Sequence, residues 1–117
     1  MKLTLGRLRE SGAENKTCLW CDARGIVHFK LTPKGQAGWN DRMFLLPLRP
    51  LLIEFKSPGE PPRKLQVYRH EILIGLSYDV QVHEEEDDAV WAIQEAIKVR
   101  ERELRVLASV GLGSTRR

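Results

Sequence analysis

The sequence predicts an α/β protein in which helices flank a mixed sheet of about four strands. Short apolar or alternating stretches, typical of strands, occupy residues 26–31, 43–46, 51–55 and 77–83. Segments with helical spacing of apolar residues precede, separate and follow these stretches. The resulting order is helix, strand, strand pair, helix, strand, helix.

The composition fits a single domain spanning residues 1–117, with its core at about 10–98 and loose termini. Two cysteines are too few for a disulfide framework, which favours a reducing compartment. The apolar runs are too short to span a membrane, and the first ten residues lack the apolar middle of a signal peptide. We therefore expect a cytoplasmic protein with no membrane partner and no nucleotide cofactor.

The first half of the chain predicts one helix and three strands. The helix covers about 10–24, with Ser11 as a candidate cap and Gly25 at its end. The strand at 26–31 leads into a glycine-rich loop. The strands at 43–46 and 51–55 form a hairpin, because Pro47 and Pro50 between them cannot continue a central ladder.

The second half predicts a helix, a strand and a final helix. The helix at 63–74 places Leu65, Tyr68, Ile72 and Leu76 near one side. It connects the strand at 51–55 to the strand at 77–83, and such a crossover implies parallel, right-handed pairing. The last helix begins in the acidic run 84–88, whose carboxylates complement the helix dipole, and the chain closes with a frayed tail.

Charged residues within the apolar hairpin indicate a possible metal-binding or catalytic site. In a strand Glu54 and Lys56 share one face, about 7 Å apart, and the hairpin brings Asp41 alongside Glu54. Buried carboxylates are costly unless they are paired or bound to a metal. Converging carboxylates with a lysine fit Mg²⁺ or Mn²⁺ and phosphodiester hydrolysis. An ion pair at a sheet edge, of Glu54 with Lys56 or Arg42, explains the spacing equally well.

Over about 10–98 the chain carries a set of motifs in a fixed order: Glu14, Gly25, Lys30, TPKGQAGWNDR, IEFKSPGEPP and Gln66. This order resembles the VRR-NUC branch of the PD-(D/E)XK nucleases, which implies a restriction-endonuclease-like core. In that branch a helical glutamate is followed by a glycine, a strand ending in lysine, a "TP.G..G.PDR" loop, a hairpin ending in "E.K.P" and a helix opening with glutamine. Asn40 stands where the family has proline, which removes rigidity but no ligand.

The resemblance implies a role for each matching position. Asp41 and Glu54 match the metal ligands, with the backbone carbonyl of Phe55 as a third, and Lys56 matches the catalytic lysine. Glu14 and Gln66 match the glutamate and glutamine that reach the same pocket from two helices. Lys30 is a phosphate neighbour.

The resemblance also implies partners. Small standalone members of the family are similar to Holliday-junction resolvases and occur largely in bacteriophages, so it implies a homodimer that cuts duplex or branched DNA in the cytoplasm of a bacterium or a phage-infected host. Basic residues concentrated between 30 and 70 fit DNA binding. The candidates for DNA contact are Lys30, Lys34, Trp39, Arg42, Arg63 and Lys64.

Other residues have simpler interpretations. Cys18 and Cys21 fit small core residues better than a zinc or redox site, because no second pair completes a ligand set. Trp39 could stack on a base or pack on the scaffold, whereas tryptophans in helices are typical of a core. We expect the histidines His28, His70 and His83 to be surface or pairing residues rather than catalysts, and the tryptophans Trp20 and Trp91 to be core residues. We expect the acidic run to be a solvated helix start.

Three functional hypotheses follow. The first is a Mg²⁺- or Mn²⁺-dependent endonuclease, selective for DNA structure. The second is a catalytically inactive nucleic-acid-binding domain with the same fold. The third is a small interaction or assembly protein whose charges form surface pairs.

Overall fold

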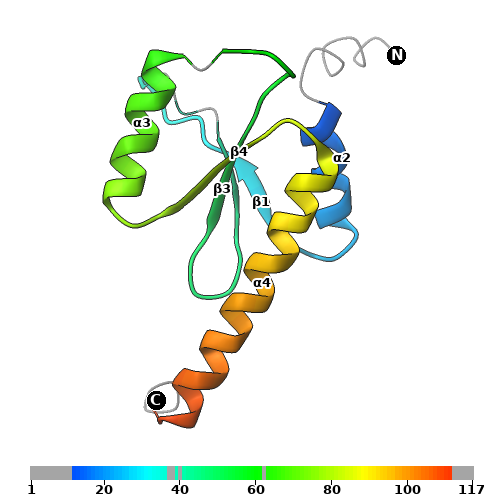
Figure 1. Cartoon of the computed structure of the whole chain (residues 1–117), viewed down its shortest axis with the longest axis vertical. Coiled ribbons are helices and arrows are strands. Elements are labelled where there is room, and N and C mark those ends of the chain that lie inside the picture. The colour runs from blue at the N-terminus through cyan, green and yellow to red at the C-terminus, as the bar shows by residue number, and fades with distance from the viewer. Residues whose placement is uncertain (1–11, 37–38, 40, 62, 112–117) are drawn as a thin grey trace.

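A computed structural model describes residues 12–36, 39, 41–61 and 63–111. This part of the chain contains three helices and one four-stranded sheet (Figure 1), which confirms the predicted α/β class. The helices are α2 (Gly12–Asp22), α3 (Lys64–Gly75) and α4 (Glu86–Ser109). The strands are β1 (His28–Lys30), β2 (Arg42–Phe44), β3 (Leu51–Phe55) and β4 (Asp79–His83). The expected cap Ser11, the position Asn40 and the predicted loose ends before residue 12 and after residue 111 lie outside the described residues.

The sheet has the order β1-β2-β3-β4. The first three strands pair antiparallel, and β3 pairs with β4 in parallel through α3, so both the predicted hairpin and the predicted parallel crossover are confirmed. Gly25 takes the expected left-handed conformation after α2, at φ +72°. In the hairpin loop Leu48 also has positive φ, 68°, which is uncommon for a residue with a side chain.

One face of the sheet carries the apolar core. Figure 1 places α2 and α4 on one side of the sheet and α3 on the other. Side chains of β2 and β3 pack there against both helices, and the fully buried members of this cluster are Cys21, Phe44, Leu51, Ile53, Ala89 and Ile93. Because strand residues alternate, the neighbours of Ile53 along β3 point to the α3 side.

The long helix α4 covers this core and then continues past the sheet (Figure 1). It starts within the acidic run, as predicted, with Glu86, Asp87 and Asp88 in its first turn. Further along, the side chain of Arg100 is buried at 2% exposure. Its guanidinium donates to the carbonyl of Arg49 at 3.2 Å and to the carboxylate of Asp79, which ties α4 to the hairpin loop and to β4.

The apolar stripe predicted for α3 is not its packing face. Leu65, Tyr68 and Leu76 are 42%, 54% and 65% exposed, and the fourth member of the stripe, Ile72, is half-buried. Gln66 is the one residue of this fully described helix that is buried. The helix is therefore rotated so that a polar side chain faces the sheet. Trp91, expected in the core, is likewise 63% exposed on α4.

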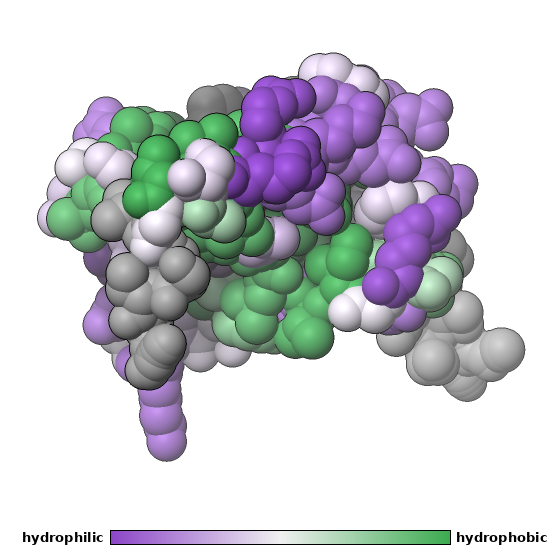
Figure 2. Space-filling view, turned by 90° about the horizontal axis from the view of Figure 1, so that it is seen from below, coloured by the Kyte–Doolittle hydropathy of each residue, from purple (hydrophilic) through white to green (hydrophobic). Residues whose placement is uncertain are grey.

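Apolar side chains also gather at one end of the molecule. Figure 2 views the end that carries the hairpin loop and the C-terminal end of α4, and green apolar surface occupies its middle and left. Leu45 donates its backbone N–H to the carbonyl of Val27 at 2.9 Å at the hairpin end of β1 and β2, and Leu48 lies in the hairpin loop. All three side chains are about half exposed. Exposed apolar surface of this kind is typical of interaction sites.

Candidate metal centre

Three potential metal ligands converge on the α3 side of the sheet. Asp41, Glu54 and His70 each offer one ligand atom, and these atoms lie within 4.8 Å of one another. Asp41 directly precedes β2, Glu54 lies in β3 and His70 lies in α3. The three residues are far apart in sequence, so the fold brings them together.

The hairpin register places the two carboxylates side by side. Arg42 pairs with Ile53, so the next position along each strand pairs Asp41 with Glu54. Residues paired in this way share a face of the sheet, opposite to Ile53. The carboxylate pair expected from the sequence is thus confirmed.

His70 reaches the two carboxylates from α3, which covers this face of the sheet. Its Nε2 atom lies 2.9 and 3.1 Å from the two oxygens of Asp41 and 3.3 Å from Oε1 of Glu54. His70 follows Gln66 by four residues, which places both on the same face of α3. The sequence interpretation treated His70 as a surface or pairing residue and missed its place in this cluster.

The cluster is buried, and burial shapes its electrostatics. Asp41 is 0% and Glu54 is 3% exposed. Burial raises the pKa of Asp41 above its ordinary value, the hydrogen bond and charge of His70 act to lower it, and the nearby Glu54 raises it further. Lys56, also buried, balances Glu54 through an ion pair of 3.1 Å between Nζ and Oε2.

The donor set fits an octahedral divalent cation. With metal–ligand distances of about 2.1 Å, adjacent ligands lie about 3.0 Å apart. His70 Nε2 lies 2.9 Å from Asp41 Oδ2 and 3.3 Å from Glu54 Oε1, which are ion-pair distances and are also close to that edge length. Two carboxylate oxygens with one imidazole nitrogen suit Mn²⁺ or a similar borderline cation, and the carboxylates also suit Mg²⁺.

Gln66 lies beside the lysine of the cluster. Lys56 Nζ donates to Oε1 of Gln66 and to the carbonyl of Pro61, each at 3.5 Å. Nε of Arg63, the residue at the N-cap position of α3, donates to the same Gln66 oxygen at 3.4 Å. Four of the five residues expected to be catalytic therefore meet in one place: Asp41, Glu54, Lys56 and Gln66.

Glu14, the fifth, makes its ion pairs elsewhere. Its Oε2 atom lies 3.0 Å from Nε of Arg42 and 3.5 Å from Nζ of Lys30. By alternation, these two cations belong to the face opposite to Asp41. The role of Glu14 in the pocket stays a prediction, as does that of the Phe55 carbonyl at the end of β3.

The residues expected to contact DNA differ in their surroundings. Lys34, Arg63 and Lys64 are exposed. Nε of Arg42 donates to Oε2 of Glu14 at 3.0 Å, and Nη1 of Arg42 lies 3.1 Å from Nδ1 of His28. Lys30 also pairs with Glu14, and half-buried Trp39 lies under the guanidinium of Arg69.

The cysteines and the other two histidines have the structural roles that the sequence predicts, whereas Trp91 does not lie in the core. Both cysteines are free, and Cys21 packs in the core, where burial raises the pKa of its thiol to about 12. His28 pairs with Asp22 at 2.8 Å. His83 contacts Gln81 at 2.6 Å, as expected for a pairing residue.

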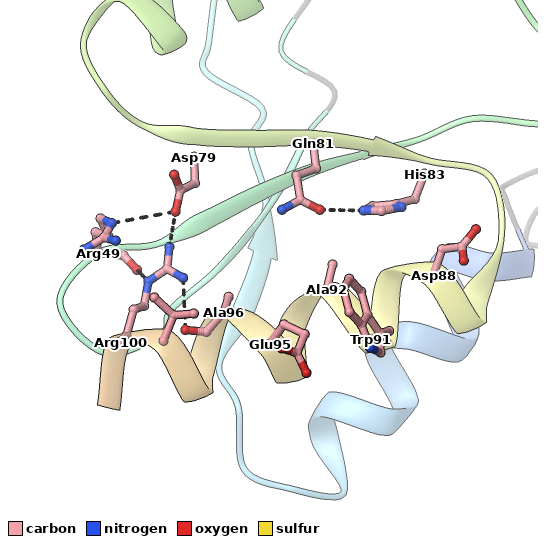
Figure 3. Close-up of a pocket in the computed structure, with 11 residues that line it drawn as sticks. Arg49, Asp79, Gln81, His83, Asp88, Trp91, Ala92, Glu95, Ala96 and Arg100 are labelled. Carbon is pink, nitrogen blue, oxygen red and sulfur yellow. Dashed lines mark hydrogen bonds and ion pairs between the residues drawn. The ribbon is translucent and has the colours of Figure 1, made fainter. Parts of the chain in front are cut away.

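A pocket lies on the face of the sheet opposite to the metal-ligand candidates, between β4 and α4 (Figure 3). Its volume is about 470 Å³, and Gln81, His83 and Trp91 line it. Figure 3 shows the network of Arg49, Asp79 and Arg100 closing one end. This pocket contains none of the three metal-ligand candidates.

Comparisons with models of protein families, with curated proteins and with solved structures found no match for this chain. No helix among residues 12–36, 41–61 and 63–111 is both long and apolar enough to cross a membrane.

Proposed function

We propose that this protein is a divalent-metal-dependent nuclease that hydrolyses phosphodiester bonds in DNA. The observation that carries the proposal is a cluster of potential metal ligands from Asp41, Glu54 and His70, whose ligand atoms lie within 4.8 Å of one another. The Nζ atom of Lys56 lies 3.1 Å from Oε2 of Glu54 beside this cluster. Buried carboxylates at this spacing are costly without a cation, and a neighbouring lysine is useful to a reaction that develops negative charge. The ordered motifs that resemble VRR-NUC nucleases support the same function.

Each residue has a proposed role in the reaction. Asp41, Glu54 and His70 hold the cation, with the carbonyl of Phe55 as a further ligand. The bound cation supplies Lewis-acid stabilisation of the phosphoryl oxygens. Lys56 donates to the phosphate under attack, where its charge favours the transition state.

Around this centre, other residues position the lysine and the DNA. Gln66 accepts a hydrogen bond from Lys56 and so fixes the direction of its ammonium group. We propose that the exposed Lys34, Arg63 and Lys64 contact backbone phosphates, because such contacts dominate DNA affinity. Glu14 holds Arg42 and Lys30 in ion pairs on the opposite face of the sheet.

We also propose that the protein acts as a homodimer on branched DNA, in a bacterial or phage-infected cytoplasm. The family resemblance supports this state, and so does the apolar surface at the hairpin end (Figure 2). Each subunit would place one metal centre against one strand. Light scattering coupled to gel filtration tests the dimer directly.

A cleavage panel tests the nuclease. Purified protein is incubated with Mg²⁺ or Mn²⁺ and labelled duplex, flap, splayed and four-way DNA. We expect cutting by the wild type, and a loss of about a hundredfold or more for Glu54→Gln with DNA binding retained. Glu71→Gln, which changes an exposed carboxylate on α3, is the matched control and should cut normally.

The outcomes separate the three hypotheses. Salt-dependent DNA binding without cleavage by either metal would favour the inactive binding domain. Absence of DNA binding would favour an interaction protein. Normal cutting by Glu54→Gln would refute the assigned centre.

A further inference from the structure

A mostly apolar cavity of about 480 Å³ opens at the end of β1. Phe29, Leu31 and Pro33 form apolar walls, and the aromatic ring of Trp39 completes them. Lys30 also belongs to the lining, but its ammonium group pairs with Glu14 on the other face of the sheet. Nothing in the proposed metal chemistry uses this cavity.

The cavity lies one strand away from the metal centre. Leu31, which lines it, donates its backbone N–H to the carbonyl of Asp41 at 2.9 Å. This bond continues the β1–β2 register, so Leu31 pairs with Asp41 as Asp41 pairs with Glu54. Paired residues share a face of the sheet and neighbouring strands are about 4.8 Å apart. The cavity therefore opens on the same face as the metal ligands, within reach of the nucleotide next to a phosphate held there.

Trp39 is held in place by polar contacts from two directions. Its Nε1 atom donates to Oε1 of Gln36 at 3.1 Å. The guanidinium of Arg69, from α3, lies 4.9 Å from the centre of its ring. These contacts fix an aromatic surface at the cavity, and Gln36 still has an amide nitrogen to offer to the edge of a ligand.

The charges around the cavity suit a nucleic acid strand. Lys34 lies exposed on the loop that forms the cavity, and Arg69 borders Trp39. A flat ring with polar edges, attached to a phosphate backbone, matches apolar walls framed by cations. A base inside an intact duplex cannot enter a concave cavity, because its faces are covered by its stacked neighbours.

We propose that this cavity binds an unpaired nucleobase of the cut strand, stacked against Trp39, next to the phosphate at the metal centre. The inference rests on the proposed nuclease function and extends it to a substrate class. The preferred substrates are DNA structures with an unpaired nucleotide beside the cleavage site, such as flaps, gaps and open junctions. Intact duplex is a poor substrate.

The test compares Trp39→Ala, Trp39→Phe and wild type on two versions of one flap substrate. One version carries the fluorescent base 2-aminopurine beside the cut site, and the other carries an abasic residue there. Binding is followed in Ca²⁺, so that the fluorescence measurement does not depend on cleavage. Cleavage rates are then measured in Mn²⁺. Trp91→Ala, which removes an exposed tryptophan from the opposite face, is the matched control.

We expect wild type and Trp39→Phe to quench 2-aminopurine on binding, and Trp39→Ala to lose the quenching. Trp39→Ala should cut the normal flap about tenfold to a hundredfold more slowly than wild type, because one stacked base is lost. On the abasic flap the two proteins should cut at similar rates. Circular dichroism establishes that each variant is folded, and Trp39→Phe keeps the test valid if the alanine variant is not.

Other outcomes overturn the inference. Equal quenching by wild type and Trp39→Ala, or an equal loss of cleavage on both flaps, would mean that Trp39 does not stack on the base. Absence of cleavage by wild type in any metal would refute the nuclease, while Trp39-dependent quenching in Ca²⁺ would still support the base site. Absence of both binding and cleavage would refute both.

Discussion

Replacing Lys56 by methionine should destabilise the metal-free protein by about 3 kcal/mol. The Nζ atom of Lys56 lies 3.1 Å from Oε2 of Glu54, and the two side chains are only 7% and 4% exposed. Removing one partner of such a pair costs about 3–5 kcal/mol, because the remaining charge stays buried without compensation. We expect the low end of this range, since His70 keeps its 3.3 Å contact with Glu54.

Urea unfolding followed by circular dichroism at pH 7 measures the effect. The set of proteins is wild type, Lys56→Met, Glu54→Gln and the double variant. The double variant removes both charges, so its cost should be well below the sum of the single costs, by about 1–3 kcal/mol. Lys64→Met, at an exposed position at the start of α3, is the control and should change stability by about 0.5 kcal/mol or less.

The same unfolding experiment, repeated with bound metal, tests whether a cation compensates the charge of Glu54. A cation bound by Glu54 takes over part of the compensation that Lys56 provides, so saturating Mn²⁺ should shrink the cost of Lys56→Met. A cost below about 1 kcal/mol for Lys56→Met, together with additive single variants, would show that the two charges are not coupled in a buried site. The electrostatic basis of the metal centre would then be wrong.

Two further predictions concern histidines. His70→Asn should weaken Mn²⁺ binding more than Mg²⁺ binding, because imidazole nitrogen favours transition metals; calorimetry measures both affinities, and an unchanged ratio would remove His70 from the ligand set. His83 has its pKa lowered by burial, against the opposing charge of Asp88, so the unfolded chain binds protons more readily than the folded protein. Stability should therefore fall as pH drops below about 6.5 towards the lowered pKa, and His83→Gln should flatten this dependence of the urea midpoint; an identical slope in both proteins would contradict it.

The carboxylate pair could be predicted from sequence because it depends on short-range rules. Strand alternation puts Glu54 and Lys56 on one face, and the two prolines indicate the turn of a hairpin that brings Asp41 alongside Glu54. The same kind of reasoning placed β4 parallel to β3, because a helical crossover separates them. Neither prediction depends on how distant elements pack.

His70 could not be found in this way, since its place depends on the rotation of α3 about its axis. The apolar stripe of Leu65, Tyr68, Ile72 and Leu76 predicts one rotation, but in the structure only Ile72 is half-buried and the other three are exposed. The helix instead turns Gln66 and His70 towards the sheet. The available signal was the spacing of four between these two residues, which places them on one helical face whatever the rotation.

The position of β3 explains how the protein tolerates buried charges. It is an interior strand, with β2 on one side and β4 on the other, so its backbone is fixed by two ladders. On one face, Leu51 and Ile53 are fully buried in the core against α4. On the other, Glu54 is held 3.3 Å from His70 although its burial is unfavourable. An edge strand could move to let water reach such a carboxylate, whereas β3 cannot move without opening the core. The apolar residues of β3 thus hold Glu54 in a position that a cation would stabilise.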